Sequence, residues 1–72
     1  MDIRRQLGRN VRRLREAKGW SQEDLGFEAE LHRTYISGIE RGVRNPTVII
    51  VAKLATALGV PPDRLLASGR GH

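Results

Sequence analysis

The sequence predicts an all-α fold, a compact domain of five helices. Apolar residues recur three or four positions apart along most of the chain, which is the spacing of one helix face. Glycine, proline and capping residues divide this pattern into short segments. With 72 residues and no cysteine, the chain can form one small core, which must be stabilised by packing alone.

The first helix is expected over residues 2–18. Its apolar stripe consists of Ile3, Leu7, Val11, Leu14 and Ala17. Gly19 ends the helix, because glycine readily adopts the left-handed conformation found after helix ends. Gly8 lies inside the helix at a cost of about 1 kcal/mol relative to alanine, so we expect either a close contact there or a tolerated surface glycine.

Two short helices are expected next, over residues 22–29 and 33–40. Ser21 and Asp24 resemble a capping box, and Trp20 can pack against the helix that they begin. His32 can cap the following helix, which ends at Gly42. Because so few residues connect the two helices, they must meet at a sharp angle.

Thr47 is expected to cap a fourth helix, which Gly59 and Pro61 end. Its core stripe consists of Val48, Val51, Leu54, Ala55 and Leu58. Pro62 suits the first position of a last helix that extends to Ala67 and buries Leu65 or Leu66. The domain is therefore expected over residues 1–67, followed by a flexible tail at 68–72.

The charge is strongly basic and unevenly distributed. Thirteen Lys and Arg residues against eight Asp and Glu residues give a formal charge of +5, so polyanions are the expected partners. Seven of the cations fall in the first 18 residues, four acids lie within residues 22–30, and basic residues return at Arg33, Arg41 and Arg44. This pattern predicts one acidic helix between two basic surfaces, although ordinary solvated faces would also carry such charges.

Other classes of function lack the residues that they need. No apolar run approaches the roughly 20 residues of a membrane span, so a cytoplasmic protein without a membrane partner is expected. The sequence offers no paired nucleophile and base, no glycine-rich phosphate loop and no metal-spaced cluster. We therefore expect no enzyme, no catalytic residue, no metal, no cofactor and no small-molecule ligand.

Several motifs occur together in one order and spacing. They are Leu14-Arg15 with Gly19, Ser21-Gln22-Glu23-Asp24-Leu25, Tyr35-Ile36-Ser37, Ile39-Glu40-Arg41-Gly42, Arg44-Asn45-Pro46 and Ala57-Leu58-Gly59-Val60. On these residues the chain resembles the helix-turn-helix domains of Cro and lambda-repressor type, the XRE family, from Leu7 to Leu66. The resemblance implies a lambda-repressor-like DNA-binding domain in which helices 2 and 3 form the helix-turn-helix.

The resemblance also implies that helix 3 lies in the major groove, with its N-terminal side chains at base edges. Arg33 is the first candidate, because it can donate two hydrogen bonds to guanine O6 and N7. Thr34 and Ser37 are short enough to contact a base or a thymine methyl group. Tyr35 would place its ring on a flanking base step, or else support the turn as a half-buried aromatic.

Further residues are implied as phosphate contacts. Gln22 resembles the family glutamine that binds a phosphate at the start of helix 2, where amide groups add a favourable dipole. Arg44 and Asn45 follow helix 3, where the family has donors to the sugar-phosphate backbone that set register without reading sequence. Arg41 beside them would contact phosphate or remain solvated.

Arg15 and Glu40 resemble the family's partly buried ion pair between helix 1 and the end of helix 3, which gives Glu40 a structural role. Two positions depart from the family pattern. Gly26 replaces a common alanine, and Glu30 stands where the turn usually has a left-handed glycine. Residue 30 must either be strained by about 1–2 kcal/mol or give the turn a different path.

Ile49 and Ile50 lie off the expected core stripe, at positions that are usually polar in such domains. A second apolar face needs a partner, so both, with Leu65 or Leu66, are expected to form a two-fold interface. A monomer with a wider core is the alternative. A homodimer would place two recognition helices about 34 Å apart on a palindromic operator.

The resemblance thus implies a sequence-specific transcriptional regulator of double-stranded DNA. The run from His32 to Ser37, with Arg44-Asn45-Pro46, is similar to the small controller proteins of restriction-modification systems, which would bind upstream of their own gene. The alternative is an antitoxin-type module that neutralises a toxin partner. Such proteins usually append a toxin-binding segment, and about five residues follow the last expected helix, which favours the regulator.

Overall fold

The computed structural model describes residues 2–68, which form five α-helices and no strand. The helices are α1 (Ile3–Ala17), α2 (Gln22–Ala29), α3 (Arg33–Glu40), α4 (Val48–Leu58) and α5 (Pro62–Leu66). Their bounds agree with the expected ranges to within one residue at each end. Residues 69–72 of the expected tail lie outside the described part, and no helix within residues 2–68 is long and apolar enough to cross a membrane.

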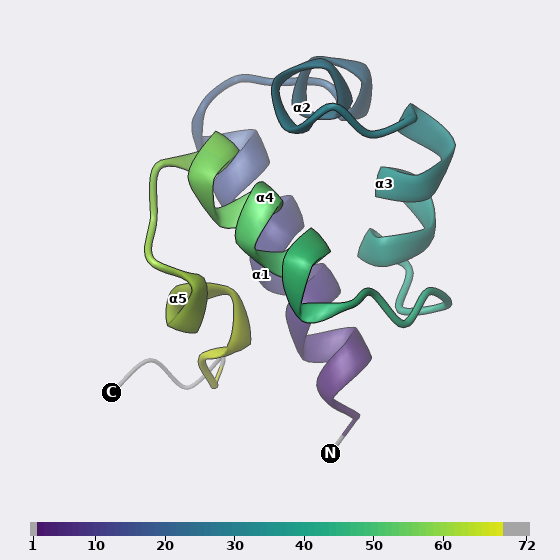
Figure 1. Cartoon of the computed structure of the whole chain (residues 1–72), viewed down its shortest axis with the longest axis vertical. Coiled ribbons are helices and arrows are strands. Elements are labelled where there is room, and N and C mark those ends of the chain that lie inside the picture. The colour runs from purple at the N-terminus through teal and green to yellow at the C-terminus, as the bar shows by residue number, and fades with distance from the viewer. Residues whose placement is uncertain (1, 69–72) are drawn as a thin grey trace.

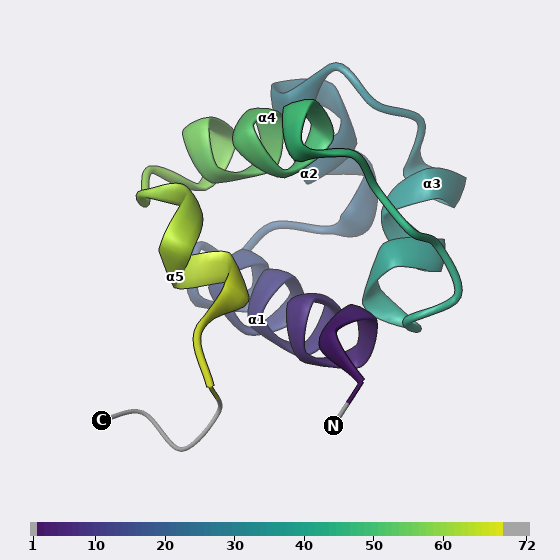
Figure 2. The ribbon, with the colours of Figure 1, turned by 60° about the horizontal axis from the view of Figure 1, so that its bottom comes forward.

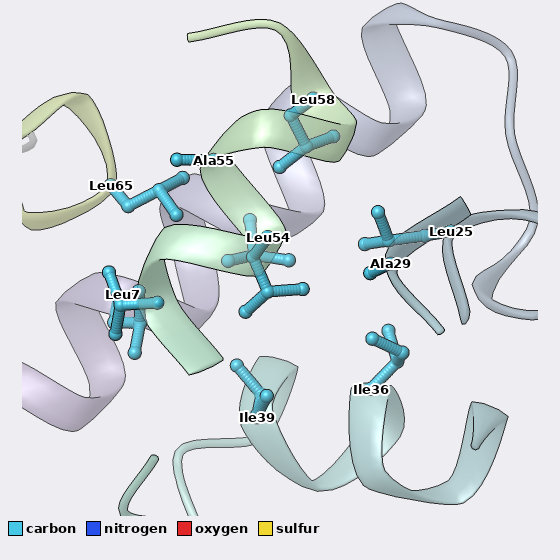
Figure 3. Close-up of a cluster of buried hydrophobic side chains, with 11 residues drawn as sticks. Leu7, Leu25, Ala29, Ile36, Ile39, Leu54, Ala55, Leu58 and Leu65 are labelled. Carbon is cyan, nitrogen blue, oxygen red and sulfur yellow. The ribbon is translucent and has the colours of Figure 1, made fainter. Parts of the chain in front are cut away.

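The helices surround one core (Figures 1 and 2). α1 and α4 lie on opposite sides of it, with α3 at one end and α5 at the other. α3 packs against both α1 and α2, and α5 packs against both α1 and α4. Figure 3 shows the buried side chains that converge from all five helices, which are Leu7, Val11, Leu25, Ala29, Ile36, Ile39, Val51, Leu54, Ala55, Leu58 and Leu65.

Local capping interactions begin the helices where the sequence indicates. The Ser21 hydroxyl accepts a hydrogen bond from the Asp24 amide at 3.0 Å, and the Asp24 carboxylate accepts one from the Ser21 amide at 2.9 Å. The predicted capping box is therefore present. His32 and Thr47 cap α3 and α4 through their side chains, as expected. Each cap satisfies an amide group that has no partner inside its helix.

Several apolar residues differ from the expected pattern, including Ala17 at the end of α1, which is exposed. Ile3 and Val48 were expected in the core, yet they are 53% and 85% exposed, because each is the first residue of its helix and the helical period does not show where the core ends. Leu65 is 0% exposed and belongs to the core. The prediction that Leu65 contributes to a dimer interface is therefore wrong, because its side chain cannot reach a second chain.

Gly8 marks the close approach of α1 to the end of α3. A Cβ atom added to Gly8 would lie 2.6 Å from the carbonyl oxygen of Glu40 and still closer to that of Ile39. Glycine therefore lets the backbones of α1 and α3 touch. The close contact expected at this position is confirmed. It determines where the end of α3 packs along α1.

Two buried amide side chains on α1 hold the last helix. Asn10 donates through Nδ2 to the carbonyl oxygens of Leu65 at 2.8 Å and Ala67 at 2.9 Å, and Gln6 donates to the carbonyl of Leu66. Both amides are almost fully buried, with 2% and 6% exposure. They satisfy carbonyl groups at the end of α5 that have no helical partner.

Candidate nucleic-acid interface

α3 is anchored by one face and presents the other to solvent. Ile36 and Ile39 point into the core and are 0% and 1% exposed (Figure 3). Arg33 and Thr34 are exposed to solvent, and Ser37 is half-buried. Because positions 33, 37 and 41 follow one another at helical spacing, the exposed face is continuous with Arg41. α3 is thus a short helix that packs against the core through one face and has polar and basic residues on its outer face.

The turn before α3 depends on the left-handed backbone of Glu30 and on the absence of a side chain at Gly26. Glu30 has φ 60° and ψ 43°, which is the left-handed conformation. Of the two alternatives expected at this position, the residue is therefore strained and the turn does not take a different path. The Leu31 amide donates to the Gly26 carbonyl at 2.8 Å and closes the turn. A Cβ atom on Gly26 would lie 2.5 Å from the Leu31 carbonyl oxygen. Even alanine at position 26 would displace the turn, so the space there is tighter than the sequence indicates.

The first turn of α3 is closed by His32. Its Nδ1 atom accepts a hydrogen bond from the Thr34 amide at 3.1 Å, and the same atom lies 2.8 Å from the Thr34 hydroxyl oxygen. One imidazole nitrogen therefore contacts both the backbone and the side chain of Thr34. The side chain of a predicted base-contacting residue is held in one orientation before any ligand binds.

The loop after α3 folds back over the helix. The amides of Val43 and Arg44 both donate to the Gly38 carbonyl, at 3.0 and 3.3 Å. A Cβ atom on Gly38 would lie 2.6 Å from Cγ of Arg44, so the Arg44 side chain crosses the helix where no side chain blocks it. The Arg44 guanidinium carbon lies 5.3 Å from the centre of the Tyr35 ring. This cation–π contact fixes the arginine beside the outer face of α3.

A buried ion pair joins α1 to the end of α3. Arg15 donates from Nε and Nη2 to the two carboxylate oxygens of Glu40, at 2.7 and 3.0 Å. Their side chains are 11% and 4% exposed. The hydrogen bonds that Arg15 donates to the Glu40 carboxylate raise the pKa of Arg15. Glu40 also accepts from Nε2 of Gln22 at 3.1 Å, so the first residue of α2 belongs to the same network.

The residues predicted to contact DNA occupy one stretch of chain plus the start of α2. Arg33, Thr34, Tyr35 and Ser37 lie in α3, Arg41, Arg44 and Asn45 lie at its end and in the loop, and Gln22 begins α2. Sequence reasoning gave Arg5 and Arg9 no discrete role. Both line a shallow depression with Arg41, so α1 adds basic side chains next to the end of α3. The charge pattern of the sequence predicted basic surfaces, but it did not show that Arg5 and Arg9 lie beside Glu40 and Arg41.

The residues predicted to form a dimer interface have different environments. Ile49 is 71% exposed and lies on an open groove between α2 and α4, whose lining includes Ala29, Ala52 and Ala57. Leu66 is 43% exposed, whereas Ile50 is half-buried and packs against the core. Of the four residues, Ile49 therefore offers the most exposed apolar side chain.

Comparisons with known proteins agree with this geometry. A family model described as helix-turn-helix matches residues 11–65. The control protein C.BamHI of Bacillus amyloliquefaciens is 52% identical over 66 residues, which cover 90% of this chain and 82% of that protein. The match thus spans the helix-turn-helix and the core around it.

Solved structures are similar along most of the chain. The restriction-modification controller protein C.AhdI from Aeromonas hydrophila has a TM-score of 0.84 and 47% identity, covering 86% of this chain and 94% of that one. The controller protein C.Esp1396I, solved as a tetramer in complex with its natural 35-base-pair operator, has a TM-score of 0.82 and 34% identity, covering 90% and 86%.

Proposed function

The chain belongs to the helix-turn-helix family, and from this premise we propose that it regulates transcription by binding a specific double-stranded DNA sequence with α3 in the major groove. The observation that carries the proposal is the exposed outer face of α3. Its core-facing isoleucines are fully buried, so the helix has a fixed angle, and its polar side chains remain available to base edges.

Arg33 is proposed as the main base-reading residue, because an exposed arginine at the helix N-terminus can make a bidentate contact with guanine. Thr34, Ser37 and Tyr35 are proposed as further base contacts. The ring of Tyr35 is already engaged by Arg44, so its hydroxyl and exposed edge are the parts left for DNA.

Arg41, Arg44, Asn45 and Gln22 are proposed as phosphate contacts. The orientation of Gln22 is favourable, since Glu40 accepts from its Nε2 atom and an amide nitrogen carries a second hydrogen. The cation–π contact of Arg44 restricts that side chain before binding and so lowers the entropy lost on contacting a phosphate. These contacts would set the register of α3 on the duplex.

A homodimer is proposed, with Ile49 at its centre and with Leu66 and the exposed part of Ile50 around it. An exposed isoleucine beside a groove that is lined by alanines and bordered by Glu28, Glu30 and Lys53 is the type of surface that a two-fold partner would cover. The dimer would bind a palindromic operator. The similarity to C.BamHI and C.AhdI supports a finer proposal, that the chain is an autoregulatory controller of restriction-modification genes. The relatives described above are controllers, which leaves the antitoxin alternative without support.

Selection of bound duplexes from a random pool at two salt concentrations tests this proposal. A palindromic consensus that persists at the higher concentration is expected, because base contacts survive when phosphate contacts weaken. Footprinting of the DNA upstream of the chain's own gene should then protect a matching site. Recovery of duplexes without any shared sequence would contradict specific binding, and protection of no upstream site would contradict the controller role alone.

A further inference from the structure

The contact between His32 and Thr34 determines which hydrogen the Thr34 side chain can offer. The backbone amide of Thr34 always carries a hydrogen, and it donates this to Nδ1 of His32 at 3.1 Å. Nδ1 must therefore be an acceptor, and in the neutral ring its proton is on Nε2. The Thr34 hydroxyl oxygen lies 2.8 Å from the same Nδ1 atom, so the only hydrogen between them is that of the hydroxyl. Thr34 therefore donates its hydroxyl hydrogen to His32.

A free threonine hydroxyl can rotate to donate or to accept, and so it suits any base. Thr34 has lost this freedom, because its hydrogen points back to His32. Only lone pairs face outward from the oxygen, on the exposed side of α3. We infer that the His32 cap turns Thr34 into an acceptor-only reader, which selects an amino base, adenine or cytosine, over a keto base, guanine or thymine, on the strand it contacts.

The chemistry of the major groove supports this selectivity. Adenine N6 and cytosine N4 present amino hydrogens there, whereas guanine O6 and thymine O4 present lone pairs. An acceptor-only hydroxyl would pair with the first group and repel the second. The inference rests on the proposed function, since it assumes that α3 contacts base edges. His32 is a positioning residue in this scheme, because it acts on the base through Thr34.

Four proteins test the inference by selection of duplexes from a random pool. They are the wild-type chain, Thr34→Val, His32→Ala and His32→Asn. Valine has the shape of threonine without the oxygen, so the position whose preference changes in Thr34→Val identifies the base that the hydroxyl contacts. At that position we expect the wild type to prefer adenine or cytosine by about three- to tenfold, the effect of one neutral hydrogen bond. We expect Thr34→Val to have lost this preference.

The two His32 variants separate positioning from stability. His32→Ala removes the acceptor and frees the hydroxyl to rotate, so the preference between amino and keto bases should fall to less than about twofold at that one position, with the rest of the consensus retained. His32→Asn keeps a capping oxygen that can accept from Thr34, and it should restore the preference. Thermal melting of each variant gives the temperature at which all are folded for binding, because loss of a cap alone lowers stability without changing base preference.

The possible results distinguish failure of the inference from failure of the proposed function. A keto base at the identified position, an unchanged preference in His32→Ala, or no position altered by Thr34→Val would overturn the inference while a consensus remains. Retention of a thymine by Thr34→Val would show that the threonine methyl group makes the contact instead. Failure of the wild type to select any consensus would contradict the proposed function itself, which distinguishes the two failures.

Discussion

The Arg44 guanidinium lies over the ring of Tyr35, with its carbon 5.3 Å from the ring centre. The contact joins the loop to α3 and holds a positive charge at the edge of the proposed DNA surface. Arg44 is exposed, so its contribution to folding is expected to be small. Its proposed role is to bind phosphate in a fixed place.

Arg44→Ala should weaken binding by a similar factor on all duplexes. Because one phosphate contact is lost, the slope of log affinity against log salt should decrease in magnitude by about 0.9. Fluorescence anisotropy at several salt concentrations measures this slope. Arg64→Ala removes an exposed arginine from α5, at the opposite end of the fold from α3 (Figure 2), and should leave the slope unchanged. A selective loss on one sequence would show that Arg44 reads bases.

Arg33→Ala should relax sequence discrimination. Loss of a bidentate contact to guanine is expected to reduce the ratio of affinities between the operator and a duplex with one altered base by about tenfold or more. Stability should change by less than about 0.5 kcal/mol, because Arg33 is exposed. Anisotropy titrations with matched and altered duplexes, paired with thermal melting, check both statements. Unchanged discrimination would remove Arg33 from the base-reading surface.

Glu40→Gln should strongly destabilise the fold. The variant keeps a polar side chain of the same shape but leaves Arg15, only 11% exposed, without its counter-charge. The expected loss is about 3 kcal/mol in the free energy of unfolding, measured by urea denaturation. Arg12→Gln breaks the surface pair with Glu16 at 3.2 Å, leaves Arg15 untouched and should cost less than about 0.5 kcal/mol. Equal effects in the two variants would contradict a structural role for the buried pair.

The pH dependence of this ion pair follows from the raised pKa of Arg15. A cation whose pKa is higher in the folded state contributes its full stability at every pH below its ordinary value, and loses it only as the pH rises through the folded value. The difference in stability between wild type and an Arg15→Met/Glu40→Gln double variant, which leaves no stranded charge, should therefore be constant from about pH 6 to about pH 9. Urea midpoints across this range provide the measurement.

Gly8→Ala should destabilise the protein, although alanine normally favours a helix. The new Cβ atom would lie 2.6 Å from the Glu40 carbonyl oxygen, so α1 and α3 must separate, at a cost of about 1–3 kcal/mol. Arg12 is an exposed position in the same helix. There, alanine should be more stable than glycine by about 1 kcal/mol. Opposite signs at the two positions, measured by thermal and urea melts, would confirm the close approach.

Ile49→Glu should convert the proposed dimer into a monomer. A charged side chain in a self-complementary apolar contact is placed twice in each dimer and faces its own copy. Phe27→Glu is the matched control, because Phe27 is 81% exposed but does not line the groove beside Ile49. Sedimentation velocity should show a monomer for the first variant and a dimer for the second. A dimer that survives Ile49→Glu would place the interface elsewhere.

Local signals in the sequence predicted the helices well. Capping residues such as Ser21 and Thr47 act within three residues of themselves, so they fix helix starts without knowledge of the fold. Periodicity was less reliable at helix ends, where Ile3 and Val48 extend past the core. In α5, five residues are too few for a period to distinguish Leu65 from Leu66. Only the position of α1 and α4 decides which leucine is buried.

The predicted site residues came from the family resemblance, and the geometry around them could not be predicted. The contact of Arg44 with Tyr35 requires the path of the loop over Gly38, which no sequence pattern indicates. The hydrogen bond between His32 and the Thr34 hydroxyl depends on one rotamer. Gln6 interrupts no motif and carries no charge, so its burial against α5 had no sequence signal.

A helix of five residues is not stable alone in water. α5 is therefore stabilised by its packing and hydrogen bonds with α1. Asn10 and Gln6 donate to the carbonyl groups of Leu65 and Leu66 in α5 and of Ala67, which follows it. During synthesis, the amides of Asn10 and Gln6 would therefore remain bonded to water until residues 62–67 leave the ribosome. The contacts that complete α1 come from α5, so successful folding requires translation of both.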